Sequence, residues 1–307
     1  MKQFCILAQC RNRSSEKLIK NLQCEDTDVY TLTYKHAPVF GDSIHMPNST
    51  WTTGRNRLLE HVSSKVHTYK YVIYLDDDTE LNTNIIDKTG MEVFKENLLK
   101  YKPGIGFPAY WWHSSVTNIF DRLGIIKNKQ AFVKLKPTSQ PVCYDHCVIA
   151  ISTHVIDKML PYHDEFDSTS WWVSGDIFCT IARAVLPDSI LQFNNVWSSN
   201  KYSEPYPNNS DSGPVGLNFF NHVLDTYTTK ILKIPLKRGE IDTWIYPTNR
   251  ELESTYTYKS INISKCNNLS TQDIYNNYYL FKHNMFWDKI STNQRQLMYS
   301  KKMQQTR

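Results

Sequence analysis

Apolar runs and helical patterns alternate along the first third of the chain. Continuous apolar or β-branched runs predict buried strands, because a strand covered on both faces has no solvent-facing positions for polar residues. These strands are expected at residues 4–9, 28–34, 71–75 and 104–111. Apolar residues spaced three or four positions apart predict helices at residues 14–22, 52–66 and 91–101. Either Thr52 or Thr53 is expected to cap the second of these helices.

This alternation predicts an α/β fold built on a doubly wound, mostly parallel sheet flanked by helices. After residue 112 the pattern becomes mixed, with a polar loop rich in Pro, Ser, Asn and Gly at 198–216. Further strands are expected at residues 130–135 and 142–152, and further helices at 153–162, 174–186, 217–227 and 271–290.

One compact unit is favoured over two independent domains. The expected catalytic unit covers residues 1–228, with a first half at 1–112 and a mixed second half at 113–228. Residues 229–307 are then a C-terminal extension packed on the same unit, and its polar, basic tail is expected to be flexible.

Composition narrows the class of protein. The chain has 307 residues, 40% of them hydrophobic, and a net charge of +5, which falls short of the dense basic face of a nucleic-acid binder. No segment approaches the roughly 20 apolar residues that span a bilayer, and the start of the chain lacks a secretory signal. Seven widely spaced cysteines indicate reduced thiols and a cytoplasmic location, in a host cell if the protein is viral.

The most distinctive stretch is the run Asp76, Asp77 and Asp78, directly after the apolar strand predicted at 71–75. Three adjacent carboxylates resist simultaneous ionisation unless a cation lies among them. Carboxylate oxygens suit Mg²⁺ or Mn²⁺, which often bridge protein carboxylates to substrate phosphates. An acidic turn that hydrogen-bonds its own backbone is the plainer explanation. The place of the run at a strand end in an α/β pattern favours the metal site.

An apolar strand ending in Asp-x-Asp, in an α/β half whose earlier loops carry arginines, resembles the GT-A-fold, nucleotide-sugar-dependent glycosyltransferases. The resemblance covers roughly residues 3–225 and identifies no subfamily. It implies that Asp78 holds the metal, that Asp76 contacts the ribose or sugar, and that Asp77 has an intermediate role. It also implies a Mn²⁺ or Mg²⁺ cofactor, a nucleotide-sugar donor (a UDP-sugar is favoured) and a glycan or glycoconjugate acceptor.

Arginines on neighbouring loops are candidates for the donor diphosphate. Arg11 and Arg13 follow the first predicted strand, where the family places its nucleotide. Arg55 and Asn56 stand near the start of a predicted helix, where backbone N–H groups favour anions. Solvated surface arginines at a helix terminus are an equally weighted explanation.

A second acidic residue is expected to face the acceptor. Asp176 begins an amphipathic helix behind Trp171 and Trp172, and the resemblance makes it the base if the enzyme inverts configuration. If the enzyme retains configuration, Asp176 positions the acceptor. The tryptophans can stack on a sugar ring or belong to the core, as can Trp111 and Trp112.

A histidine late in the catalytic unit often completes the metal site of this family. His222 is the best placed candidate and His283 the runner-up, although a histidine among apolar neighbours is as readily a core residue. In the segment CYDHC, Asp145 and His146 are weaker candidates for facing the acceptor.

Other enzyme classes share parts of this pattern. A haloacid-dehalogenase-type phosphatase wants Thr or Val where this chain has Glu80. A DEDD-type exonuclease wants Asp-x-Glu, which Asp78 and Glu80 supply, but it also wants a late His or Tyr four residues before an Asp. In this chain His222 precedes Asp225 by three. Both expect their motif on the first strand. A nucleotidyltransferase normally has a glycine-rich N-terminal loop, which the segment AQCRNRSS lacks. A non-catalytic carbohydrate-binding protein would not need the acidic run.

Overall fold

The computed structural model describes part of the chain. The described residues are 2–11, 21–37, 43–110, 138–139, 146–165, 167–168, 172–186 and 189–200. The helix expected at 14–22 lies almost entirely outside them. The strand expected at 130–135, the helices expected at 217–227 and 271–290, and the extension at 229–307 also lie outside the described residues.

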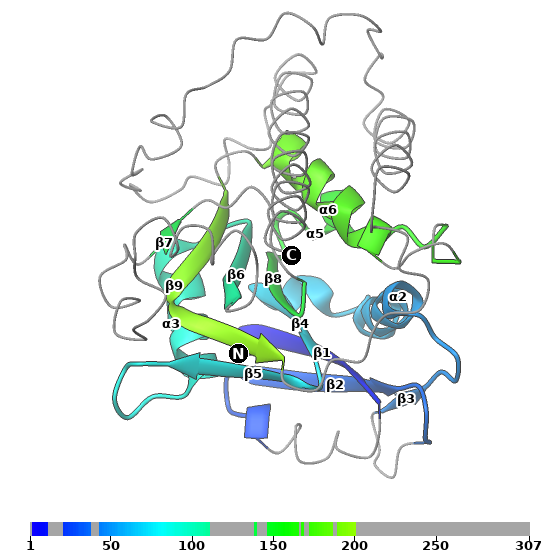
Figure 1. Ribbon diagram of the computed structural model, residues 1–307, viewed down its shortest axis with the longest axis horizontal. Coiled ribbons are helices and arrows are strands. Elements are labelled where there is room, and N and C mark those ends of the chain that lie inside the picture. Colours follow the sequence, from blue (N-terminus) through cyan, green and yellow to red (C-terminus); the bar gives the residue numbers. More distant parts are fainter. Residues whose placement is uncertain are drawn as a thin grey trace, which may run out of the picture.

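The described strands form one mixed sheet flanked by helices, so the chain has an α/β fold (Figure 1). Eight strands follow the order β3-β2-β1-β4-β8-β6-β9-β5, and β7 pairs with β9 beside this path. The strands are β1 (Phe4–Cys10), β2 (Thr27–Thr33), β3 (Ile44–His45), β4 (Tyr71–Asp76), β5 (Thr79–Thr83), β6 (Ile105–Tyr110), β7 (Thr138–Ser139), β8 (Val148–Ser152) and β9 (Ile190–Asn200). The helices are α2 (Trp51–Val62), α3 (Gly90–Tyr101), α5 (Ile156–Met159) and α6 (Trp172–Val185), with a 3₁₀ turn at Val66–Thr68.

Strand direction divides the sheet in two. Strands β3, β2, β1 and β4 run parallel to one another, as the alternation of strands and helices predicts. Strand β8 is antiparallel to both β4 and β6, β6 is parallel to β9, and β5 is antiparallel to β9. The expectation of a mostly parallel sheet therefore holds for the first half only, and the sheet as a whole is mixed.

The sheet has to curl because of the short connection between β4 and β5. Asp76 and Thr79 are three residues apart, so their Cα atoms lie within about 11 Å of each other. In a flat sheet, the three strands between β4 and β5 would separate them by roughly 19 Å. Curling brings the far edge of the sheet, β5, back toward the carboxyl end of β4.

Helices bury the two faces of the sheet separately. Residues of β4 alternate: Val72 and Tyr74 pack into a core with α2, α5 and α6, whereas Tyr71, Ile73 and Leu75 pack into a core with α3. All seven residues of β1 are buried, because this strand is covered on both faces. The continuous apolar runs in the sequence record this double coverage.

Several local expectations were wrong. The cap of α2 is Thr50, which forms a capping box with Thr53, so the helix begins one residue earlier than Thr52. Strand β9 continues to Asn200, so the loop expected at 198–216 does not begin at 198. Only Ile156–Met159 of the helix expected at 153–162 is helical. Strands β3, β5, β7 and β9 were not predicted, since polar residues interrupt each of them or they are very short.

Two glycines allow a matched test of this packing. A Cβ atom on Gly90, at the start of α3, would lie 2.4 Å from the carbonyl carbon and oxygen of Leu81. Gly90→Ala is expected to lower the free energy of unfolding by about 1–3 kcal/mol, because the clash is with backbone. The described atoms nearest to a Cβ atom on Gly175, within α6, belong to His146, at 3.6 Å or more, which is an ordinary van der Waals distance. Gly175→Ala is therefore expected to stabilise the protein by roughly 0.5–1 kcal/mol through helix propensity. Urea unfolding of both variants tests the pair, and equal effects would contradict the close contact between α3 and β5.

Candidate functional site

The three aspartates lie at the carboxyl end of the parallel half of the sheet. Strand β4 ends at Asp76, and Asp77 and Asp78 form the turn that leads into β5. Successive side chains of a strand point to opposite faces. Asp76 therefore shares a face with Val72 and Tyr74, which is the face covered by α2. The three aspartates are not equivalent, and their positions on the pleated strand decide which neighbours each one meets.

Asp76 forms an ion pair with an arginine buried beneath it. Nη2 of Arg55 donates to Oδ1 of Asp76 at 2.7 Å and to the backbone oxygen of His146 at 2.8 Å. The side chain of Arg55 is 1% exposed and that of Asp76 is 16% exposed. Burial opposes the charged form of Arg55, but the nearby Asp76 and Tyr162 raise its pKa above the ordinary value. The guanidinium is thus held charged inside the protein.

Aromatic rings complete the surroundings of Arg55. Its Cζ lies 3.9 Å from the ring centroid of Trp51 and 5.2 Å from that of Tyr74. Tyr162 contributes a third ring at 5.9 Å and packs edge-on against Trp51. Ring faces attract a cation and exclude water, so they strengthen the pair between Arg55 and Asp76.

Asp77 meets the ends of the two neighbouring strands. The backbone N–H of Arg11, just past β1, donates to Oδ2 of Asp77 at 2.7 Å. Tyr34 follows β2, and burial together with the charge of Asp77 raises the pKa of its hydroxyl to about 12. Burial and the charges of Asp77 and Asp76 also raise the pKa of the Cys10 thiol well above its usual value. The end of β1, the end of β2 and the acidic turn therefore lie close together.

Among the other predicted site residues, only Asn56 and His146 have side chains in the described part of the structure. Asn56, on α2, exchanges two hydrogen bonds with the backbone of Tyr162, at 2.7 and 2.8 Å, and so anchors the segment that follows α5. Trp172 and Asp176 are placed on α6, but their side chains lie outside the described part. The remaining predicted site residues also lie outside the described residues, namely Arg13, Trp111, Trp112, Trp171, Asp145, His222 and His283.

Helix α2 also binds the segment that leads toward α6. The hydroxyl of Thr52 donates to Oδ1 of Asp167 at 2.7 Å, and the hydroxyl of Thr50 donates to Oδ2 of the same carboxylate. Burial raises the pKa of Asp167. A carboxylate therefore already occupies the first turn of α2, where the helix dipole favours an anion.

Sequence reasoning missed Gln9, Tyr34 and Asp167. Gln9 is paired with Asp76 across β1 and β4 and donates to the backbone oxygen of Thr50 at 2.9 Å. Tyr34 is the last residue of one predicted strand, and Asp76 directly follows another. Because the ends of parallel strands meet at one edge of a sheet, this position could have placed Tyr34 near the aspartates. Asp167 gives no local signal, because only the fold brings it to α2.

His146 lies in the core rather than on an exposed acceptor face. Nδ1 is 3.4 Å from the hydroxyl of Tyr162, and Nε2 is 3.3 Å from Sγ of Cys179. Burial and the positive charge of Arg55 lower its pKa to about 3. The imidazole is therefore neutral at physiological pH.

Comparisons with known proteins give little guidance. No protein-family model and no curated protein matches the chain. Among solved structures, the crystal structure of A197 from STIV is similar at 10% identity and a TM-score of 0.38, covering 66% of this chain and 86% of that one. No helix in the described part of the chain is both long and apolar enough to cross a membrane.

Removing the carboxylate of Asp76 is expected to destabilise the protein. Asp76→Asn leaves the buried guanidinium of Arg55 without its counter-charge, which costs about 3 kcal/mol. Asp77→Asn is the matched control: its amide oxygen can still accept from Arg11, so the cost is below about 1 kcal/mol. Urea unfolding of the two variants measures the difference. Equal costs would show that the pair between Arg55 and Asp76 contributes little.

The neutral state of His146 predicts a pH dependence. Below pH ~6.5 the unfolded chain takes up a proton at this residue and the folded protein does not, so stability falls as pH falls toward about 3, by up to ~1.4 kcal/mol per pH unit. His163, whose pKa burial also lowers, adds a slope that a His146→Gln variant keeps. Urea unfolding at about pH 7 and about pH 5 should therefore show a shallower slope for His146→Gln than for the parent protein. Equal slopes would mean that His146 is protonated in the folded state.

Proposed function

We propose that the protein is a metal-dependent glycosyltransferase that moves a sugar from a nucleotide diphosphate donor to a hydroxyl group of a glycan or glycoconjugate. A UDP-sugar is the favoured donor. The observation that carries the proposal is the position of Asp76, Asp77 and Asp78, at the carboxyl ends of the parallel strands β1, β2 and β4. Ligands of open α/β sheets bind at this edge. The parallel half of the sheet is also compatible with the nucleotide-binding half of a GT-A-like fold.

The residues at this edge fit Mn²⁺ or Mg²⁺ by their chemistry. Carboxylate oxygens are the donors these ions prefer, and they commonly supply only one or two of the ligands. Burial and the negative charges of the aspartates raise the pKa of Tyr34, and a cation bound at the turn would offset those charges. Among the described residues, no three His, Cys, Asp or Glu side chains are already grouped as a metal site. We therefore assign Asp78 as the protein ligand, with the donor diphosphate supplying further oxygens and His222 as the second candidate ligand. The bound metal would neutralise the leaving diphosphate.

The two other aspartates have different roles in this proposal. Arg55 fixes the carboxylate of Asp76, so Asp76 can offer a rigid acceptor to hydroxyl groups of the ribose or the sugar. Asp77 fastens the turn to the end of β1 through the backbone of Arg11. The direct donor contacts of Arg11, Arg13, Arg55 and Asn56 remain predictions, and for Arg55 the role supported by its contacts is to orient Asp76.

Asp176 is the proposed base in an inverting reaction. It would take the proton of the acceptor hydroxyl as the oxygen attacks the anomeric carbon. In a retaining reaction it would instead orient the acceptor. The aromatic residues Trp111, Trp112, Trp171 and Trp172 are the proposed walls of the sugar pocket.

Nucleotide binding gives the direct test. With Mn²⁺ present, one of UDP, GDP or CMP should raise the melting temperature, and without a divalent cation the effect should be smaller. Asp78→Asn should abolish the metal-dependent part. Asp157→Asn is the matched control, because Asp157 is an exposed aspartate on α5, and it should respond like the parent protein.

Two results would contradict the proposal. If no nucleotide changes the melting temperature of the parent protein at any Mn²⁺ concentration, the proposed donor site is wrong. Asp176→Ala should keep nucleotide binding and lose sugar transfer, so normal transfer by this variant would rule out Asp176 as the base.

A further inference from the structure

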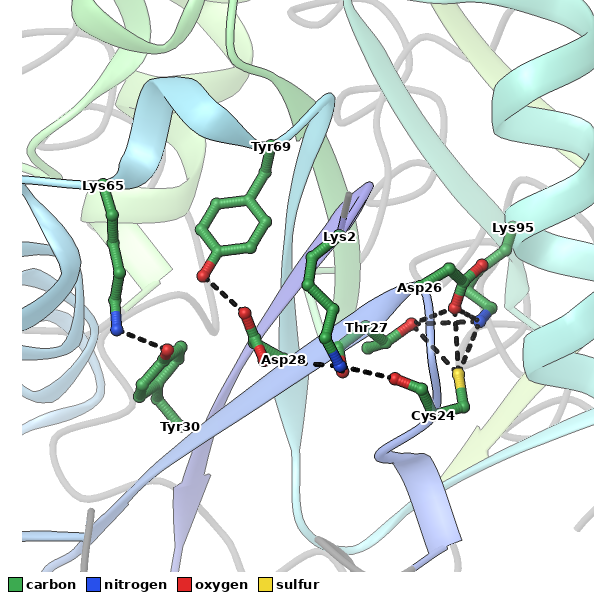
Figure 2. A network of polar contacts seen from close by, with 9 residues as sticks. All are labelled: Lys2, Cys24, Asp26, Thr27, Asp28, Tyr30, Lys65, Tyr69 and Lys95. Carbon is green, nitrogen blue, oxygen red and sulfur yellow. Dashed lines mark hydrogen bonds and ion pairs between the residues drawn. The ribbon is translucent and has the colours of Figure 1, made fainter.

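A second polar cluster lies at the opposite end of the parallel strands from the acidic turn. It joins the start of β2 to α3 and to the residues just before β1 (Figure 2). At its centre stand Cys24, Asp26, Thr27 and Lys95, and Figure 2 shows their polar atoms converging on one another. The proposed glycosyltransferase site uses none of these residues.

The thiol of Cys24 and the ammonium group of Lys95 are in direct contact. Nζ of Lys95 donates to Sγ of Cys24 at 3.3 Å. The same Nζ donates to Oδ1 of Asp26 at 2.7 Å and to Oγ1 of Thr27 at 3.0 Å. These contacts hold the amine against the sulfur. Backbone geometry supports the arrangement, because Thr27 N–H donates to the carbonyl of Cys24 and folds the turn back on itself.

The thiol of this pair is accessible to a small oxidant, whereas the amine is buried. Cys24 is exposed, whereas the other cysteines in the described part are buried. Lys95 is 9% exposed, and the ring of Phe4 lies 5.2 Å from its Nζ. An exposed thiol beside a fixed cation is the kind of environment in which cysteines are oxidised selectively.

Asp26 accepts hydrogen bonds from both the thiol and the amine. Sγ of Cys24 donates to Oδ1 of Asp26 at 2.9 Å. Burial opposes ionisation of Asp26, but hydrogen bonds from Cys24, Lys95 and Thr27 lower its pKa to about 2. The carboxylate is therefore ionised at neutral pH, and it holds the thiol and the ammonium group against each other.

We propose that Cys24 and Lys95 form an oxidation-sensitive pair that hydrogen peroxide links covalently through one oxygen atom, as S–O–N. The first peroxide transfers one oxygen atom to the thiol, which becomes a sulfenic acid, and its other oxygen atom leaves as water. The second oxidises the nitrogen to the hydroxylamine level as the O–N bond forms. In total, one thiol, one ammonium group and two peroxide molecules give the link, three water molecules and one proton. An S–O–N bridge suits the separation of Sγ and Nζ better than a direct S–N bond, because the oxygen atom fills part of the gap.

The link would be a reversible covalent cross-link that stabilises the fold. Cys24 and Lys95 are 71 residues apart in sequence, so the bridge closes a long loop that contains strands β2 and β4. Closing a long loop restricts the unfolded chain and stabilises the folded one. The melting temperature should therefore rise on treatment with peroxide and fall again after a thiol reductant.

Mass spectrometry after peroxide treatment tests the proposal. The intact protein should gain one oxygen atom and lose two hydrogen atoms, and digestion should yield one peptide pair joining Cys24 to Lys95. Cys24→Ser should show neither change. Lys95→Arg keeps the positive charge beside Asp26 but lacks the amine, so it should show oxidation of Cys24 without the link. Lys100→Gln removes another lysine of α3 and should behave like the parent protein.

Three outcomes would overturn the proposal. One is Cys24 oxidised to sulfinic acid with Lys95 unmodified in the parent protein. Another is a link to Lys2, whose Nζ contacts the carbonyl of Cys24 at 2.8 Å rather than its sulfur. The third is a linked peptide pair that persists in Lys95→Arg. None of these results depends on sugar transfer, so the proposed function stands or falls separately.

Discussion

The pair between Arg55 and Asp76 organises the middle of the described structure. A guanidinium that is 1% exposed can remain charged only beside a counter-charge, and Asp76 provides it at 2.7 Å. The same guanidinium binds the carbonyl of His146 and lies against the ring of Trp51. Helix α2, the end of β4 and the residues just before β8 are thereby joined through one side chain. Because the last residue of β4 is fixed in this way, the turn formed by Asp77 and Asp78 begins from a rigid point.

Helix α2 connects this point to the second half of the molecule. Arg55 faces Asp76, Asn56 holds the backbone of Tyr162, and Thr52 holds the carboxylate of Asp167. These contacts follow from successive positions on one short helix, which present side chains in different directions. The segment leading to α6 is thus attached to the same helix that orients Asp76. In the proposed enzyme, this helix would link the donor end of the site to the helix that carries Asp176.

The opposite end of the parallel strands has a different kind of polar chemistry. Around the acidic turn, burial and the charges of the three aspartates raise the pKa of Tyr34. Around Cys24, Lys95 forms an ion pair with Asp26, and the reactive group of the cluster is a thiol exposed to solvent. Our two proposals accordingly assign cation binding to one end and oxidation to the other. The sheet keeps the two ends apart, since β1, β2 and β4 run between them.

The sequence by itself determined the parallel half of the fold and the place of the acidic run. The apolar runs of β1, β2 and β4 are continuous because both faces of these strands are covered, so a local pattern was enough to find them. The aspartates directly follow one of these runs, which placed them at the carboxyl ends of the parallel strands. Only the tertiary structure decided that Arg55 is buried against Asp76, that β5 pairs with β9, and that Asp167 meets α2 and Lys95 meets Cys24. Each of these contacts joins residues far apart in the chain, and no local periodicity encodes such a pairing.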